Sequence, residues 1–265
     1  IKIHQSLTVR PNISKELKVE IHQALALDYE KFTQFSKAKK EAEQVLKIEK
    51  RNIWALQYLL FLSEKEENWD QAVGLTKQIQ KITGKHDPDD LARFQVYKGL
   101  EKLKSGFPDE ARSFFNKALK SSPDFGLPYR YLGDVFEQIR DLVKAVENWE
   151  SFAVRDIKNA SLVFGKIESA LFDLGRYSEV ENFYRRILEI DSSNFEAIIR
   201  LANVLEEKGE DGAALSLIED AIDPQSIDVR GEIMKLKLSL TTSTPVELSH
   251  QIDSILEKLS DAKDS

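Results

Sequence analysis

Apolar residues recur along this chain at the three- and four-residue spacing of amphipathic helices, and short polar segments separate the apolar stretches. Residues 92–125 give the clearest example, because two such stretches meet at the helix-breaking segment Gly106-Phe107-Pro108 and a second breaker, Pro123, closes the unit. The pattern therefore predicts two helices joined by a tight turn.

Small side chains mark the line along which these two helices should touch. Gly99 stands on the first helix, and Ala111 and Ala118 stand on the second. Two helices reach the short end of the ~8–10 Å range of axial distances only where small residues face each other. A unit of 34 residues with this arrangement is the tetratricopeptide pattern. Such a unit cannot bury its apolar face alone, so the pattern predicts further copies.

The copies are found at a nearly constant spacing. Positions equivalent to Ala111 are Ala38, Ala72, Ala145, Val180 and Ala214, so successive steps are 34, 39, 34, 35 and 34 residues. Positions equivalent to Gly99 are Ala26, Leu60, Gly133, Glu168 and Ala202. Leu60 and Glu168 are not small, and we expect wider separation in their helix pairs.

We therefore predict an all-α fold, a tetratricopeptide α-solenoid in which antiparallel helix pairs form a right-handed superhelix of about fifteen helices. The prediction treats residues 1–260 as one solenoid. Its parts are an orphan helix at 1–10, repeats at about 19–50, 53–84, 92–125, 126–158, 161–194 and 195–224, a degenerate C-terminal pair at 225–260 and a linker-like tail at 261–265.

Composition and charge exclude several functional classes. The net charge is −7 and no long basic run occurs, so binding of nucleic acid through phosphate neutralisation is not expected. The chain has no cysteine, which excludes disulfides and thiolate metal sites. No apolar run reaches the ~18 residues of a membrane span. Because the chain starts with Ile inside what looks like a repeat, we expect it to be a piece of a longer protein.

Residues for catalysis are not apparent. The four histidines are scattered and none has a second ligand at metal spacing. Adjacent acids such as Glu66-Glu67 do not face each other on a helix and cannot act as a general acid/base pair. We therefore predict a non-enzymatic protein without cofactor or metal in these residues.

Protein binding on the inner, concave face is the remaining expectation, because the first helix of each pair lines that face in this architecture. Counting from the small positions, the candidate groove residues are Trp54, Gln57, Phe61, Arg130, Asp134, Phe172 and Asn203. The alternative for most of them is packing between repeats or simple solvation. They lack the repeated Lys/Asn/Lys/Arg set with which some tetratricopeptide domains hold a terminal carboxylate.

Three segments carry a more specific resemblance. Residues 1–7 (IKIHQSL), 24–46 (ALALDYEKFTQFSKAKKEAEQVL) and 54–73 (WALQYLLFLSEKEENWDQAV) resemble the family of the bacterial lipopolysaccharide assembly protein B. The resemblance implies a parent with an N-terminal membrane anchor, a cytoplasmic repeat solenoid and a C-terminal rubredoxin-type domain. That domain would hold iron or zinc with two Cys-x-x-Cys pairs, which this sequence does not contain.

The role implied by the resemblance is an adaptor on the cytoplasmic side of the inner membrane that regulates lipopolysaccharide biosynthesis. Its partners would be the FtsH protease and lipopolysaccharide biosynthesis enzymes. A generic tetratricopeptide co-chaperone or a scaffold of a secretion or assembly complex is the alternative. A regulatory module of an enzyme is a third.

Overall fold

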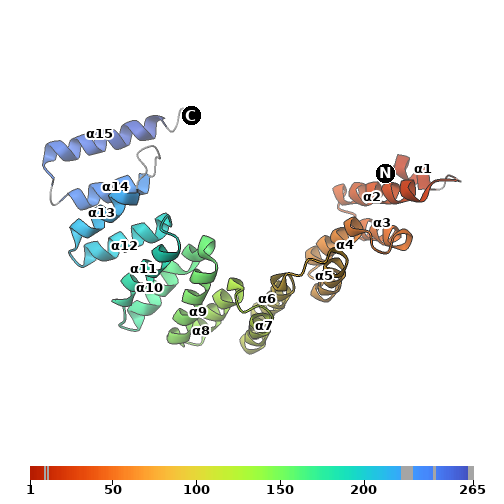
Figure 1. The fold of residues 1–265 in the computed structure, drawn as a ribbon, viewed down its shortest axis with the longest axis horizontal. Coiled ribbons are helices and arrows are strands. Elements are labelled where there is room, and N and C mark those ends of the chain that lie inside the picture. Colours follow the sequence, from red (N-terminus) through yellow and green to blue (C-terminus); the bar gives the residue numbers. More distant parts are fainter. Residues whose placement is uncertain (9, 11, 222–228, 241–242, 262–265) are drawn as a thin grey trace. The chain divides into compact units, whose positions relative to one another are not determined.

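The computed structural model describes the chain except for residues 9, 11, 222–228, 241–242 and 262–265, and the described residues form helices and no strand (Figure 1). The helices are α1 Lys2–Thr8, α2 Lys15–Lys31, α3 Phe35–Ile48, α4 Ile53–Lys65, α5 Trp69–Thr83, α6 Pro88–Lys104, α7 Pro108–Ser121, α8 Gly126–Gln138, α9 Leu142–Arg155, the 3-10 helix η1 Ile157–Val163, α10 Phe164–Asp173, α11 Glu179–Ile190, α12 Phe195–Glu207, α13 Asp211–Ala221, α14 Val229–Ser239 and α15 Pro245–Asp261.

Consecutive helices pack in pairs, which confirms the predicted all-α helix-pair fold. The pairs are α2–α3, α4–α5, α6–α7, α8–α9, α10–α11 and α12–α13. In all of them except α10–α11, three residues join the two helices. A connection this short makes neighbouring helices antiparallel.

The turns inside the pairs share one backbone conformation. A residue with positive φ follows the first helix at Thr33, Glu67, Gly106, Arg140, Gly175 and Gly209, and these positions are 34, 39, 34, 35 and 34 residues apart. The next N–H donates back into the helix, as in the 2.9 Å bond from Phe107 N to Lys102 O. This is the Schellman ending of a helix, in which glycine is favoured. The turns therefore repeat with the same period as the small residues.

The chain divides into two compact units, Ile1–Phe125 and Gly126–Ser265. The first contains α1 to α7 and the second contains η1 and α8 to α15. The predicted continuous superhelix over 1–260 concerns the relation between these units and stays a prediction. The predicted tail at 261–265 falls almost wholly outside the described residues.

Within the first unit, small residues bring the helices together as the sequence indicates. Ala26, Ala38 and Ala42 are fully buried between α2 and α3. In the α6–α7 pair, Gly99 lies directly against the ring of Phe115, which is itself fully buried. A Cβ at position 99 would lie only 2.4 Å from Phe115 Cε1, so a methyl group does not fit there.

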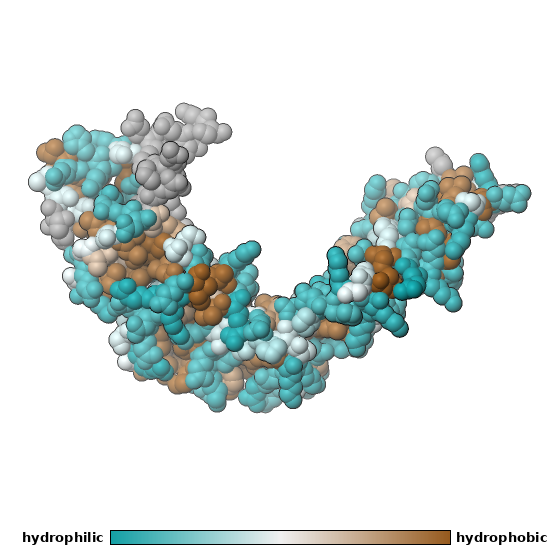
Figure 2. Space-filling view, viewed as in Figure 1, coloured by the Kyte–Doolittle hydropathy of each residue, from teal (hydrophilic) through white to brown (hydrophobic). Residues whose placement is uncertain are grey.

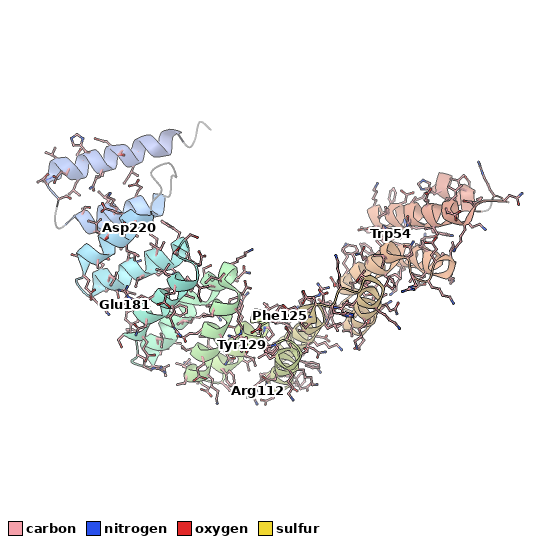
Figure 3. The ribbon with its side chains drawn as sticks, viewed as in Figure 1. Trp54, Arg112, Phe125, Tyr129, Glu181 and Asp220 are labelled. Carbon is pink, nitrogen blue, oxygen red and sulfur yellow. The ribbon has the colours of Figure 1, made fainter. Side chains whose placement is uncertain are left out.

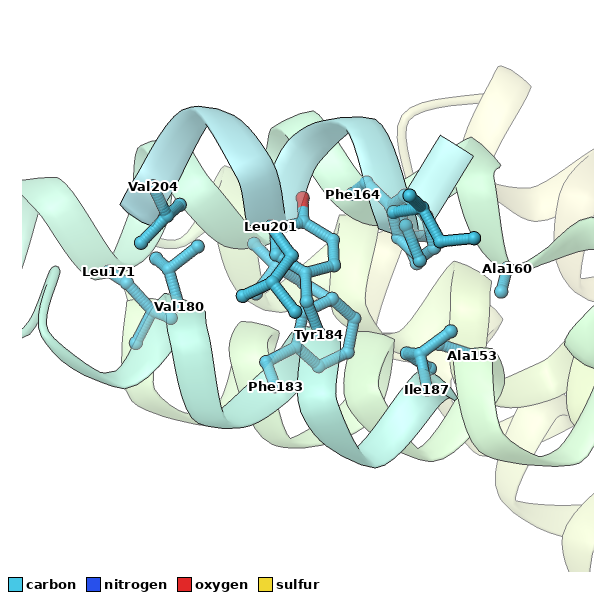
Figure 4. Packing of buried hydrophobic residues seen from close by; sticks show 14 of the residues in the cluster. Ala153, Ala160, Phe164, Leu171, Val180, Phe183, Tyr184, Ile187, Leu201 and Val204 are labelled. Carbon is cyan, nitrogen blue, oxygen red and sulfur yellow. The ribbon is translucent and has the colours of Figure 1, made fainter. Parts of the chain in front are cut away.

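Within the second unit, the core is rich in aromatic rings (Figure 4). Phe164 meets Phe183 and Tyr184 edge to face, with ring centroids 5.6 and 5.1 Å apart. Edge-to-face contacts of this kind stabilise a core beyond the buried area. Gly133 of α8 lies against the buried ring of Trp149 on α9, which repeats the glycine–aromatic contact of the α6–α7 pair.

One element differs from the expected pattern. The repeat predicted at about 161–194 begins with the 3-10 helix η1 rather than with a regular α-helix. Asp156 ends α9 by donating its N–H to Phe152 O at 2.8 Å, and its carboxylate accepts both 3.0 Å bonds of the Asn159 amide. These local side-chain bonds compete with α-helical pairing at this point. As a result α10 starts only at Phe164.

Candidate functional site

The first helices of consecutive repeats in the second unit share one face, which we call the first-helix face (α8, α10, α12 and α14). Charged pairs connect its neighbouring helices. Lys166 of α10 bonds Asp134 of α8 at 2.9 Å. Arg200 of α12 bonds Glu168 of α10 at 2.6 Å, and Lys237 of α14 bonds Glu206 of α12. Each of these ion pairs therefore links two neighbouring repeats.

Two adjoining hollows open on this face. The first has a volume of about 600 Å³ and is lined by residues of α10, α12 and α14 together with Tyr177. The second has a volume of about 580 Å³ and is lined mainly by the C-terminal end of α10. The linings are Glu168, Tyr177, Glu196, Ile199, Arg200, Asn203, Val204, Glu206, Glu207 and Lys237 for the first, and Glu168, Ser169, Phe172, Asp173, Tyr177 and Glu207 for the second. Three residues belong to both linings, so we treat the two hollows as one candidate site.

A hydrogen-bonded chain fixes the centre of the site. The buried Tyr184 hydroxyl donates to Glu168 at 2.5 Å, and Arg200 donates to the other oxygen of Glu168 at 2.6 Å. Arg200 also donates to Glu196 at 2.9 Å. Burial, and then the hydrogen bond to the Glu168 carboxylate, raise the pKa of the Tyr184 hydroxyl, so it stays protonated and acts as a donor.

An exposed aromatic corner forms the edge of the site. The side chain of Phe172 is 71% exposed, and its ring contacts the edge of the Tyr177 ring at a centroid distance of 6.2 Å. The Tyr177 hydroxyl donates to Glu207 at 3.2 Å, and burial followed by the Glu207 charge raises the pKa of that hydroxyl. Figure 2 shows apolar surface bordered by hydrophilic surface over the part of this unit where α10 to α12 lie. The site therefore combines an apolar ring with neighbouring carboxylates.

Four of the residues predicted from the sequence lie on the first-helix face. Phe172 lines the second hollow and Asn203 lines the first, where its amide donates to Ile199 O at 3.0 Å. Asp134 accepts from the Trp149 indole at 3.0 Å and from Lys166. Arg130 lies over the Tyr131 ring at 5.4 Å. Two of the predicted residues, Phe172 and Asn203, thus line the hollows. Asp134 and Arg130 do not line them and instead interact with neighbouring side chains on α8 to α10.

The other three predicted residues lie in the first unit, on α4. Trp54, labelled in Figure 3, stacks on Tyr58 with centroids 5.1 Å apart and is partly buried against the core. Gln57 is exposed. Phe61 is 39% exposed, with the Lys65 ammonium 5.1 Å from its ring centroid. These residues form a group of their own on α4, and their role in binding stays a prediction.

The sequence analysis missed the charged part of the site. Glu168, Arg200 and Glu207 were not among the candidates, although Glu168 was noted as an exception to the small-residue rule. A usable signal was present on α12, because Arg200 and Glu207 are three residues before and four residues after Asn203 and so share its helix face.

Other kinds of site are not supported by the described part of the chain. It contains no group of three or more His, Asp or Glu side chains arranged to hold a metal ion. Every helix within the described ranges is too short or too polar to span a bilayer.

The chain resembles curated proteins of one name over most of its length. Lipopolysaccharide assembly protein B of Escherichia coli strain K12 is 23% identical over 214 residues, which are 81% of this chain and 55% of the relative. The protein of the same name from Haemophilus influenzae is 27% identical over 217 residues, covering 81% of this chain and 54% of the relative. The chain therefore spans about half the length of these relatives. No family model matches the sequence.

Among solved structures, MamA aligns with a TM-score of 0.45 and 20% identity, covering 63% of this chain and 97% of that protein. A tetratricopeptide repeat protein from Parabacteroides merdae aligns with a TM-score of 0.39 and 13% identity, covering 91% of this chain and 93% of that protein. The helix pairs described above establish the fold independently of these alignments. The chain is thus an all-α tetratricopeptide-type protein whose homologues include proteins named lipopolysaccharide assembly protein B.

Proposed function

We propose that this chain is a non-enzymatic tetratricopeptide scaffold that binds protein partners in lipopolysaccharide assembly through the first-helix face of its second unit. The single observation that carries the proposal is the similarity to lipopolysaccharide assembly protein B over 81% of the chain. The open, polar and aromatic hollows on α10, α12 and α14 supply a surface suited to that role.

The chemistry of the site favours binding over catalysis. The carboxylates at its centre are engaged: Glu168 accepts from Tyr184 and Arg200, and Glu206 accepts from Lys237. A general base must be within reach of the proton it removes and must be able to accept it. Carboxylate oxygens that already accept hydrogen bonds have fewer lone pairs left to take up a substrate proton. The proposal therefore assigns no reaction, metal or cofactor to these residues.

The proposed parent protein regulates lipopolysaccharide biosynthesis on the cytoplasmic side of the inner membrane. The proposed partners are the FtsH protease and lipopolysaccharide biosynthesis enzymes. These finer assignments extend the resemblance of residues 1–7, 24–46 and 54–73 to the family, and each is tested by identifying the bound protein.

The test is affinity capture from detergent-solubilised Escherichia coli membranes, with the tagged chain as bait and an unrelated tetratricopeptide protein as control bait. Mass spectrometry identifies the retained proteins. We expect lipopolysaccharide biosynthesis enzymes or FtsH to be enriched on this chain and not on the control bait. Enrichment of chaperones or secretion components in their place would assign the chain to the generic scaffold class and overturn the proposal.

A further inference from the structure

We propose that the two adjoining hollows on α10, α12 and α14 bind an extended basic segment of a partner protein, one that carries lysine or arginine next to an apolar side chain. This inference rests on the proposed function, because it assumes that the first-helix face is the binding face. It adds the chemistry of the partner segment, which the similarity to known proteins does not supply.

The charge of the lining is the first argument. The two hollows are lined by the five carboxylates Glu168, Asp173, Glu196, Glu206 and Glu207 and by the two cations Arg200 and Lys237. Both cations are already paired with these carboxylates, through the bonds from Arg200 to Glu168 and Glu196 and from Lys237 to Glu206. The lining therefore has a formal surplus of three negative charges. A charged hollow of this kind attracts cations and repels anions.

The surplus is concentrated at the exposed end of the site. Glu207 and Asp173 are both exposed, and neither has an ion pair among the described residues. Glu207 accepts a 3.2 Å hydrogen bond from the Tyr177 hydroxyl, which is neutral and leaves the charge of the carboxylate uncompensated by any described residue. A lysine or arginine of a partner would find both carboxylates accessible at this end. Anionic lipid head groups and phosphate are disfavoured for the same reason.

The aromatic corner supplies the apolar part of the specificity. Phe172 exposes 71% of its side chain beside Tyr177, in the same hollow as Asp173 and Glu207. An exposed ring next to carboxylates can hold the stem of a lysine or stack on an arginine guanidinium, whose charge is attracted to the ring face. The partly exposed Ile199 extends the apolar surface into the first hollow.

The size of the site fits a short segment. Volumes of about 600 and 580 Å³ lie within the ~300–1,000 Å³ range of ligand pockets. Both hollows therefore have room for side chains of an extended peptide, with an apolar residue by Phe172 and basic residues on either side of it.

The test is fluorescence anisotropy with a labelled ten-residue peptide of alternating lysine and leucine with one central phenylalanine. One control peptide has glutamate in place of lysine, and a second has serine in place of the apolar residues. We expect the basic–apolar peptide to bind at least about tenfold more tightly than either control. Its affinity should fall several-fold between about 50 and about 300 mM NaCl, because salt screens exposed charges.

Variants locate the binding on the chain. Phe172→Ala should weaken binding by about 3- to 10-fold, as expected for an aromatic anchor. The double change Asp173→Asn with Glu207→Gln should weaken binding and flatten the salt dependence. The controls are Phe107→Ala, another exposed aromatic, and Glu189→Gln, an exposed acid on α11. Both should bind the peptide as the wild type does, and circular dichroism verifies that every variant keeps its helix content.

Two results would overturn the inference: no preference for the basic–apolar peptide, or equal weakening by the site variants and the control variants. The peptide-binding result and the affinity-capture result test the inference and the proposed function separately. Capture of lipopolysaccharide enzymes without peptide preference would retain the function and reject the inference. Site-specific peptide binding with no such capture would retain the inference about the chemistry of the site and reject the function.

Discussion

Gly99→Ala tests the register of the helix pairs most sharply, because it adds a single methyl group. The new Cβ would lie 2.4, 2.8 and 2.9 Å from three atoms of the Phe115 ring. The ring is fully buried between α6 and α7 and cannot move into solvent. Overpacking of this kind costs ~1–3 kcal/mol. The gain in helix propensity from glycine to alanine, about 1 kcal/mol, offsets part of that cost.

Gly74→Ala is the matched control, since Gly74 also lies inside a helix of the first unit, on α5, and its Cβ would meet nothing within 4 Å. The propensity gain is common to both variants, so the difference between them isolates the steric cost. We expect Gly74→Ala to raise the free energy of unfolding by about 0.5–1 kcal/mol. The free energy of unfolding of Gly99→Ala should be lower than that of Gly74→Ala by about 1–3 kcal/mol, which is the steric cost.

Urea unfolding followed by circular dichroism measures both changes against the wild type. Thermal unfolding gives a second reading, because about 1 kcal/mol corresponds to a shift of ~2–4 °C in a chain of this size. Equal stability of the two alanine variants would refute the assigned contact between Gly99 and Phe115, and with it the register derived from the small residues.

Three further predictions follow from single contacts. Thr33 is a β-branched residue at φ 57°, so Thr33→Gly should raise the free energy of unfolding by about 0.5–1 kcal/mol in a urea titration, and destabilisation would contradict the strain argument. Tyr184→Phe removes the donor to Glu168 and should lower that free energy by about 1.5 kcal/mol, an effect that should vanish in a Glu168→Ala background, which lacks the acceptor, if the bond is responsible. Hydrogen bonds from Lys208 and then Arg185 lower the pKa of Glu181 below its ordinary value of 4.5. These bonds therefore stabilise the fold fully above about pH 4.5, and their contribution is lost as the pH falls through the lowered pKa. Stability measured from pH 5 downward should therefore fall less steeply in Glu181→Gln than in the wild type, and parallel curves would exclude this role (Figure 3 labels Glu181).

The fold could be predicted from the sequence because its contacts depend on side-chain volume at fixed spacing. Gly99 against Phe115, and Gly133 against Trp149, pair the smallest residue with a large ring, and both glycines were located by counting. The turns could be predicted only in part. Gly106 indicates a left-handed backbone conformation because glycine favours positive φ. Arg140 in the equivalent turn gives no such indication, since its positive φ is imposed by the Schellman hydrogen bonds and not by its residue type.

The candidate site was predictable in its apolar part but not in its charged part. Phe172 could be placed on the first-helix face from helical periodicity alone. The bond between Tyr177 and Glu207 joins residues 30 positions apart, and many other acids of the sequence have a similar local context. Likewise, counting selects Trp54 of α4 as a candidate binding residue but does not reveal that its ring stacks on Tyr58. Which side chains pair across repeats depends on their rotamers in the folded state.

The most direct test of the central claim is photo-crosslinking at the proposed binding face in living cells. A benzoylphenylalanine replaces Phe172, which is exposed beside the hollows, and in a control variant it replaces the exposed Phe107 of the first unit. Each variant is produced in Escherichia coli, irradiated, and its adducts are identified by mass spectrometry. The account predicts adducts at position 172 with a lipopolysaccharide biosynthesis enzyme or FtsH, and none of these at position 107. Adducts at position 172 with chaperones or secretion components alone, or the same adducts at both positions, would contradict it.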